Sequence, residues 1–158
     1  MSKRNIIIGA VTIALAIGWY AFRPELLFVS KQVNEQFPTS GQVTAGPMTL
    51  AKGSFKSLAN ETKGLATIYQ LADGKQTLRL TEFETSNGPD VHVYLTAAEV
   101  EKGSDALKAA GFVDLGSMKG NKGDQNYDVP ADVDLAKYKS VTIWCARFGV
   151  NFGIAPLS

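Results

Sequence analysis

After about residue 49 the chain consists mostly of short segments in which apolar and polar residues alternate with the period of a β-strand. Turn-forming residues such as Asp73-Gly74 and Asn87-Gly88-Pro89 separate these segments. In residues 91–95 the alternation is regular, and Val91, Val93 and Leu95 fall on one face. Seven to nine such segments predict an all-β domain, an antiparallel β-sandwich or barrel.

The period changes between residues 96 and 111. Residues 96–99 have the spacing of a capping box, in which a threonine precedes a glutamate by three positions. Ser104 and Asp105 stand before an alanine-rich segment, residues 106–110, that Gly111 ends. These residues predict short helical insertions in the β domain.

The clearest hairpin is near the end of the chain, between residues 141–148 and residues 152–157. One face of its first strand carries Val141, Ile143, Cys145 and Arg147, and the other carries Thr142, Trp144, Ala146 and Phe148. Both faces are largely apolar, which is typical of a central strand with material packed on each side. An arginine is seldom buried without a partner, so we expect this strand to leave the core near Arg147, with the Cys145 thiol held at the rim and reachable.

The N-terminal segment differs from everything after it. Lys3 and Arg4 precede residues 5–22, which carry no charge, and Arg23-Pro24 ends the run. As a helix this run is about 27 Å long, close to the ~30 Å hydrocarbon thickness of a bilayer. It predicts a transmembrane anchor, and the basic residues on its N-terminal side place residues 1–4 in the cytoplasm.

The same segment is open to a second interpretation, a secretory signal that is removed. No small-x-small cleavage site follows the apolar run, which favours an uncleaved signal anchor. We therefore expect a single-pass membrane protein whose C-terminal domain is periplasmic or extracellular. In this division residues 23–41 are a tether and residues 42–158 form the extracytoplasmic domain.

Charge and composition narrow the function classes. The formal net charge is +1, too small for nucleic acid to be the principal partner. One histidine and one cysteine are too few for a structural zinc site, and we predict no metal site. A Cys-His pair without a recognisable oxyanion hole does not indicate a hydrolase. Whether the protein is an enzyme stays open, with an electron-transfer or binding module favoured over a stand-alone enzyme.

Four segments, taken together, resemble the electron-transfer DM-thirteen domain family, including its membrane-anchored bacterial single-domain members. They are Gly88-Pro89-Asp90-Val91-His92-Val93-Tyr94-Leu95; Leu115-Gly116 with Lys119-Gly120-Asn121; Gly123-Asp124-Gln125-Asn126-Tyr127-Asp128-Val129-Pro130; and Ile143-Trp144-Cys145 with Phe148 and Phe152-Gly153-Ile154-Ala155. The resemblance implies extracytoplasmic redox chemistry through a single cysteine, as a bare thiol or as ligand to a prosthetic group such as haem. That cysteine corresponds to Cys145.

Three side chains are therefore candidates for the site. Cys145 is either a redox thiol or a small buried hydrophobe, and as the only cysteine it cannot form an internal disulfide. Arg147, two residues away on the predicted strand face, is expected to favour the thiolate. His92 is either a second haem ligand or an ordinary strand histidine. Any haem must be held non-covalently, because no Cys-x-x-Cys-His motif is present.

The sequence leaves two functions open. The first is electron transfer or thiol redox chemistry at Cys145 in a membrane-anchored extracytoplasmic domain, with an unidentified redox or surface protein as partner. The alternative is a non-catalytic cell-surface binding or structural module, because a β-sandwich alone does not decide function.

Overall fold

The computed structural model describes residues 2–22, 29–38, 46–97 and 104–158. Two helices lie in these ranges, α1 (Lys3–Phe22) and α2 (Ser104–Ala110). The strands are β1 (Met48–Ser54), β2 (Lys56–Ser57), β3 (Lys63–Gln70), β4 (Gln76–Glu84), β5 (Val91–Thr96), β6 (Phe112–Ser117), β7 (Gln125–Val129), β8 (Ser140–Cys145) and β9 (Val150–Pro156).

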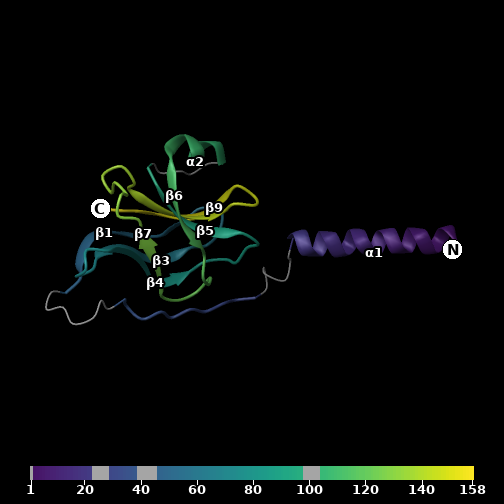
Figure 1. Ribbon diagram of the computed structural model, residues 1–158, viewed down its shortest axis with the longest axis horizontal. Coiled ribbons are helices and arrows are strands. Elements are labelled where there is room, and N and C mark those ends of the chain that lie inside the picture. Colours follow the sequence, from purple (N-terminus) through teal and green to yellow (C-terminus); the bar gives the residue numbers. More distant parts are fainter. Residues whose placement is uncertain (1, 23–28, 39–45, 98–103) are drawn as a thin grey trace.

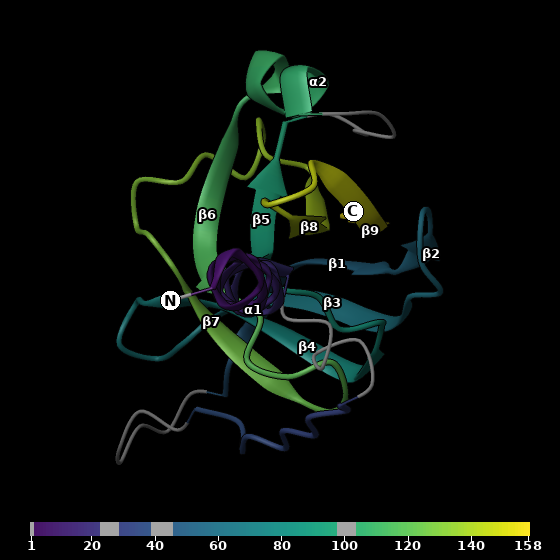
Figure 2. The same cartoon turned by 90° about the vertical axis from the view of Figure 1, so that its right-hand side faces the viewer.

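The strands form two sheets that pack face to face (Figure 1; Figure 2). The first has the order β1-β3-β4-β7 and the second β2-β9-β8-β5-β6. Every strand pairing within both sheets is antiparallel. The sequence predicts an all-β, antiparallel sandwich or barrel with short helical insertions. For the described residues the all-β class is confirmed, and the two sheets form a sandwich.

The core lies between the sheets and is built from the inward residues of their strands. Val91, Val93 and Leu95 of β5 are buried in it, as their alternation predicts. They face side chains of the first sheet such as Ile68 and Leu80, both fully enclosed. Burying an aliphatic side chain of this size contributes about 2 kcal/mol. Burial of the alternating positions therefore holds the two sheets together.

Strand β8 is central in its sheet, between β5 and β9. All six of its residues are buried, which confirms the prediction of a strand covered on both faces. It is shorter than predicted, because β8 ends at Cys145 and residues 146–149 form the turn to β9. The backbone N–H of Ala146 donates a hydrogen bond of 2.8 Å to the carbonyl of Asp90, on the β5 side of the strand, as the chain enters the turn.

Helix α2 covers part of the outer face of the second sheet. Its Leu107 packs with Tyr94 and Trp144 in a small cluster outside the main core. The predicted helix at residues 106–110 is confirmed, and it begins at Ser104. The capping-box prediction extends to Glu99, which lies outside the described residues.

Residues 29–38, which we call the strap, run in an extended line along the first sheet (Figure 2). The backbone N–H groups of Val33 and Glu35 donate to the carbonyls of Lys122 and Asp124, each at 2.9 Å. These residues belong to the predicted tether, yet they are hydrogen-bonded to the sandwich. Where the tether ends and the domain begins stays a prediction.

Helix α1 stands apart from the sandwich and its apolar side chains are exposed (Figure 1). Leu15 is 69% exposed and Trp19 is 62% exposed. Among the described residues, however, no helix combines the length and the hydropathy expected of a membrane span. The transmembrane helix predicted for residues 5–22 is not supported by this structure and stays a prediction.

Candidate functional site

Cys145 is the last residue of β8 and its side chain points into the core. It lies opposite Val91 of β5 and Val150 of β9, so neighbouring strands flank it on both sides. Only 1% of its surface is exposed, although Ala146, the next residue, is exposed. The expectation that the thiol is reachable from solvent is therefore wrong. The strand stays in the core through Cys145 and leaves it only at the next residue.

Arg147 does not lie on the strand face that carries Cys145. It is in the turn of residues 146–149, where the two-residue alternation no longer applies, and it is exposed. The prediction that places Arg147 beside the thiol extends the strand three residues too far. Its proposed role in tuning the Cys145 thiol loses this geometric basis.

His92 points to the opposite face of the same sheet. It is paired with Trp144, whereas Val91 is paired with Cys145, so alternation places the imidazole outside and the thiol inside. The expected strand face, shared with Tyr94, is confirmed by ring centroids 5.7 Å apart. The structure therefore does not bring His92 and Cys145 together.

Two carboxylates hold the imidazole of His92. Its Nδ1 lies 3.0 Å from Asp114 Oδ2, and its Nε2 lies 3.1 Å from Asp90 Oδ1. Burial lowers the pKa of His92, but the hydrogen bonds and charges of Asp114 and Asp90 outweigh it and raise the pKa above its ordinary value. The pair of carboxylates therefore stabilises an imidazolium that links β5 to β6.

The residues present do not fit a haem bound by both predicted ligands. The sheet itself separates Cys145 from His92, and one iron cannot be reached from both faces. Within the described ranges, no group of three or more histidine, cysteine, aspartate or glutamate side chains is arranged to hold a metal ion. We therefore propose no role for a haem held by these two residues.

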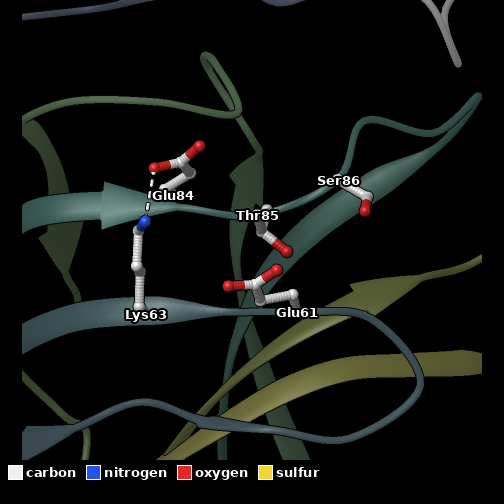
Figure 3. Close-up of a pocket in the computed structure, with 5 residues that line it drawn as sticks. All are labelled: Glu61, Lys63, Glu84, Thr85 and Ser86. Atoms are coloured by element: carbon white, nitrogen blue, oxygen red, sulfur yellow. Dashed lines mark ion pairs between the residues drawn. The ribbon is translucent and has the colours of Figure 1, made fainter.

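Cys145 lines none of three cavities on the surface of the described part of the chain. The first, of about 260 Å³, is polar and is shown in Figure 3. In it Glu84 Oε2 forms an ion pair of 2.9 Å with Lys63 Nζ. A second lysine, Lys122, lies 2.6 Å from the other carboxylate oxygen of Glu84. Hydrogen bonds from these two lysines lower the pKa of Glu84 to about 2.

The other two cavities are open grooves. One of about 530 Å³ lies between the sheet edges, where Lys52 and Lys56 approach Leu65 and Pro156. The other, of about 230 Å³, lies where Lys31, Asp90 and Met118 meet. Neither Cys145 nor His92 lines these two grooves.

A polar cluster under the strap is the feature that the sequence pattern does not reveal. The guanidinium of Arg79 donates to Asp124 Oδ2 at 2.6 Å and to the carbonyl of Glu35 at 3.1 Å. The Glu35 carboxylate accepts from Lys119 Nζ and from the backbone N–H of Asn126. Burial raises the pKa of Glu35, but these hydrogen bonds outweigh it and lower the pKa below its ordinary value.

The only sequence signal for this cluster is in the segments that carry the family resemblance. A side-chain carbon at Gly120 would lie 2.5 Å from the carbonyl oxygen of Lys31, and one at Gly123 would collide with the carbonyl of Val33. Glycine at these positions lets the strap approach the loop closely. Part of the motif therefore has a structural role.

Comparison with known proteins identifies the family. The family described as Electron transfer DM13 matches residues 54–157, a stretch that includes Cys145, His92 and eight of the nine strands in full or in their greater part. No curated protein and no solved structure matches the chain. With two thirds of its length matched, the chain belongs to the electron transfer DM13 family.

Proposed function

We propose that this chain is an extracytoplasmic electron-transfer domain in which Cys145 is the redox-active side chain, used as a bare thiol. The observation that carries the proposal is the family match over residues 54–157, which contains the single cysteine of the chain. A lone cysteine in an oxidising compartment has no internal disulfide partner, so it stays available for intermolecular redox chemistry.

Access to the thiol is the physical condition that this function must meet. Cys145 is buried, but it directly precedes a turn whose residues Ala146, Arg147 and Phe148 are exposed. Opening of a turn at the edge of a domain requires less free energy than unfolding of its core. We propose that such an opening at residues 146–149 exposes the thiol to its redox partner.

We propose further that α1 anchors the domain in a membrane, with the N-terminus in the cytoplasm. Residues 5–22 carry no charge, and the side chains of Ile7, Ile13 and Leu15 are more than 60% exposed. A contiguous apolar surface of this kind marks a membrane or protein contact. The basic Lys3 and Arg4 on one side of it give the orientation.

A second function is favoured by one observation, the 1% exposure of Cys145. A cysteine enclosed by apolar neighbours acts as a small core residue. The domain would then be a non-catalytic binding or structural module at the cell surface, and its redox chemistry, if any, would not depend on the thiol.

Thiol–disulfide exchange of the native full chain in detergent with oxidised glutathione separates the two functions. The Cys145 thiolate attacks the glutathione disulfide, one glutathione leaves as its thiolate, and excess reduced glutathione reverses the mixed disulfide. We expect mass spectrometry to find this mixed disulfide while the thermal transition shows a folded protein, with Cys145→Ala as the control for reaction elsewhere. An absorption spectrum of the same sample detects any coloured cofactor. A mixed disulfide that forms only after the protein is denatured would contradict a redox role for Cys145.

A further inference from the structure

The strap determines where the N-terminal segment leaves the sandwich. Val29 is the first residue described after α1, and its carbonyl accepts a hydrogen bond of 3.1 Å from Asn87 Nδ2. Six residues separate Phe22 from Val29, and a fully extended chain spans about 25 Å over that interval. The end of α1 therefore lies within about 25 Å of Val29, which is hydrogen-bonded to Asn87.

The strap is held along its length rather than at one point. The backbone N–H of Lys31 donates to Asn121 Oδ1 at 2.7 Å, and Asn126 Nδ2 donates to the carbonyl of Gln36 at 2.8 Å. At its far end the ring of Phe37 contacts Tyr69 edge-on, with centroids 5.0 Å apart. This series of contacts keeps the exit point fixed on the domain.

The exit point lies at the same end of the sandwich as the β8–β9 turn. Asn87 belongs to the connection between β4 and β5, and the carbonyl of Asp90 in that connection accepts the N–H of Ala146. The β3–β4 turn, residues 71–75, is at the other end of β4. A strap that ends at Asn87 therefore presents residues 146–149 toward α1 and turns residues 71–75 away.

The tip of the β8–β9 turn has the side chains of a lipid interface. Arg147 is exposed, and Phe148 is 53% exposed. Aromatic side chains insert at the headgroup level of a bilayer, and cationic side chains are attracted to anionic headgroups. An exposed arginine and phenylalanine side by side on a hairpin tip match both requirements.

We propose that residues 146–149 contact the lipid surface that α1 enters, and that the strap holds this end of the domain against the membrane. This inference rests on the membrane anchor of the proposed function. It deepens that function, because it places the turn that follows Cys145 at the membrane surface, where a redox partner would have to act.

Site-specific photocrosslinking tests the contact in the full chain. Phe148 is replaced by p-benzoylphenylalanine and the protein is reconstituted in vesicles of phosphatidylcholine and phosphatidylglycerol. The matched control carries the same group at Ala72, an exposed residue of the β3–β4 turn. After irradiation, mass spectrometry is expected to find at least a tenfold higher yield of lipid adduct at position 148; equal yields would overturn the proposal.

The role of the strap needs a second comparison. Glu35→Ala with Phe37→Ala removes strap side chains that contact Lys119 and Tyr69 but leaves the sandwich unchanged. This double variant is expected to lower the adduct yield at position 148 severalfold, whereas Gln32→Ala, at an exposed strap position, keeps it. An unchanged yield in the double variant would show that the strap does not hold the turn at the membrane.

Flotation of the same vesicles separates this inference from the proposed function. A chain that does not float with the vesicles after alkaline extraction lacks the anchor, and the proposed membrane attachment fails. A chain that floats but forms no lipid adduct at position 148 keeps the anchor and overturns the inference alone.

Discussion

The accessibility of Cys145 distinguishes a redox domain from a structural module. Its side chain is buried in the core, on a strand flanked by β5 and β9, yet the next residue is exposed. The alternation of residues 141–145 correctly places Cys145 on one face with Val141 and Ile143, and all three are buried in the core. It does not predict the burial of the thiol, because that depends on where the strand ends, and the turn begins only at Ala146.

Substitutions of Cys145 report on this burial. Cys145→Ala is expected to lower the free energy of unfolding by about 1 kcal/mol through lost apolar contact. Cys145→Ser is expected to cost more, about 1–3 kcal/mol, because a hydroxyl at this apolar position gives up its hydrogen bonds to water. Denaturant titrations measure both values, and equal stability of the serine and alanine variants would contradict an apolar enclosure.

His92 gives a second prediction at the residue scale. Asp114 and Asp90 raise its pKa in the folded state above the ordinary value of about 6.5. A raised folded pKa contributes stability that is fully present below the unfolded pKa and is lost as the pH rises through the folded pKa. Because His92 is the only histidine in the sequence, an NMR titration of the imidazole signals measures its pKa without residue assignment.

The stability measurement uses a matched variant. As the pH rises above about 6.5, the denaturation midpoint is expected to fall in the native protein, with a smaller fall in His92→Gln. A fall of equal size in the variant would assign the dependence to other groups.

At the scale of elements, the sequence pattern predicts the strands better than their ends or the strap. Segments such as residues 91–95 alternate regularly, so their burial is readable. The strap has no such period, and it is held by side chains far away in the sequence, such as Arg79 and Asn126. Contacts of this range leave no periodic signal, which is why residues 29–38 read as a tether.

Gly123 tests the attachment of the strap. It has a φ of 94°, and a side-chain carbon there would collide with the carbonyl of Val33. Gly123→Ala is therefore expected to displace the strap and to raise hydrogen exchange at the N–H groups of Val33 and Glu35 by at least about tenfold, because both lose their carbonyl partners.

Gly74→Ala is the matched control for that variant. Gly74 has a φ of 84°, so alanine strains the backbone there as well, but no atom lies within 4 Å of the added carbon. We expect it to destabilise the β3–β4 turn without changing exchange in the strap. Equal exchange of the strap in the two variants would show that the close approach at Gly123 does not hold it.

At the scale of the whole molecule, the sandwich extends beyond the family match on its N-terminal side. The family match begins at residue 54, so α1, the strap and almost all of β1 precede it. The all-β architecture follows from the alternating pattern, whereas the relation of His92 to Cys145 does not. Two residues on neighbouring strands share a face when the register pairs them or offsets them by an even number of positions. Here Val91 is opposite Cys145, so His92, one residue further, lies on the other face.

We propose that the thiol of Cys145 is buried in the native fold and becomes exposed when residues 146–149 open locally. The most direct test is the rate of maleimide labelling of the native full chain as denaturant is raised, compared with the rate of global unfolding. We predict labelling far slower than that of a free thiol, through an opening that requires less free energy than global unfolding and depends weakly on denaturant. Labelling that occurs only through global unfolding would contradict a local opening and leave Cys145 as a packing residue of the core.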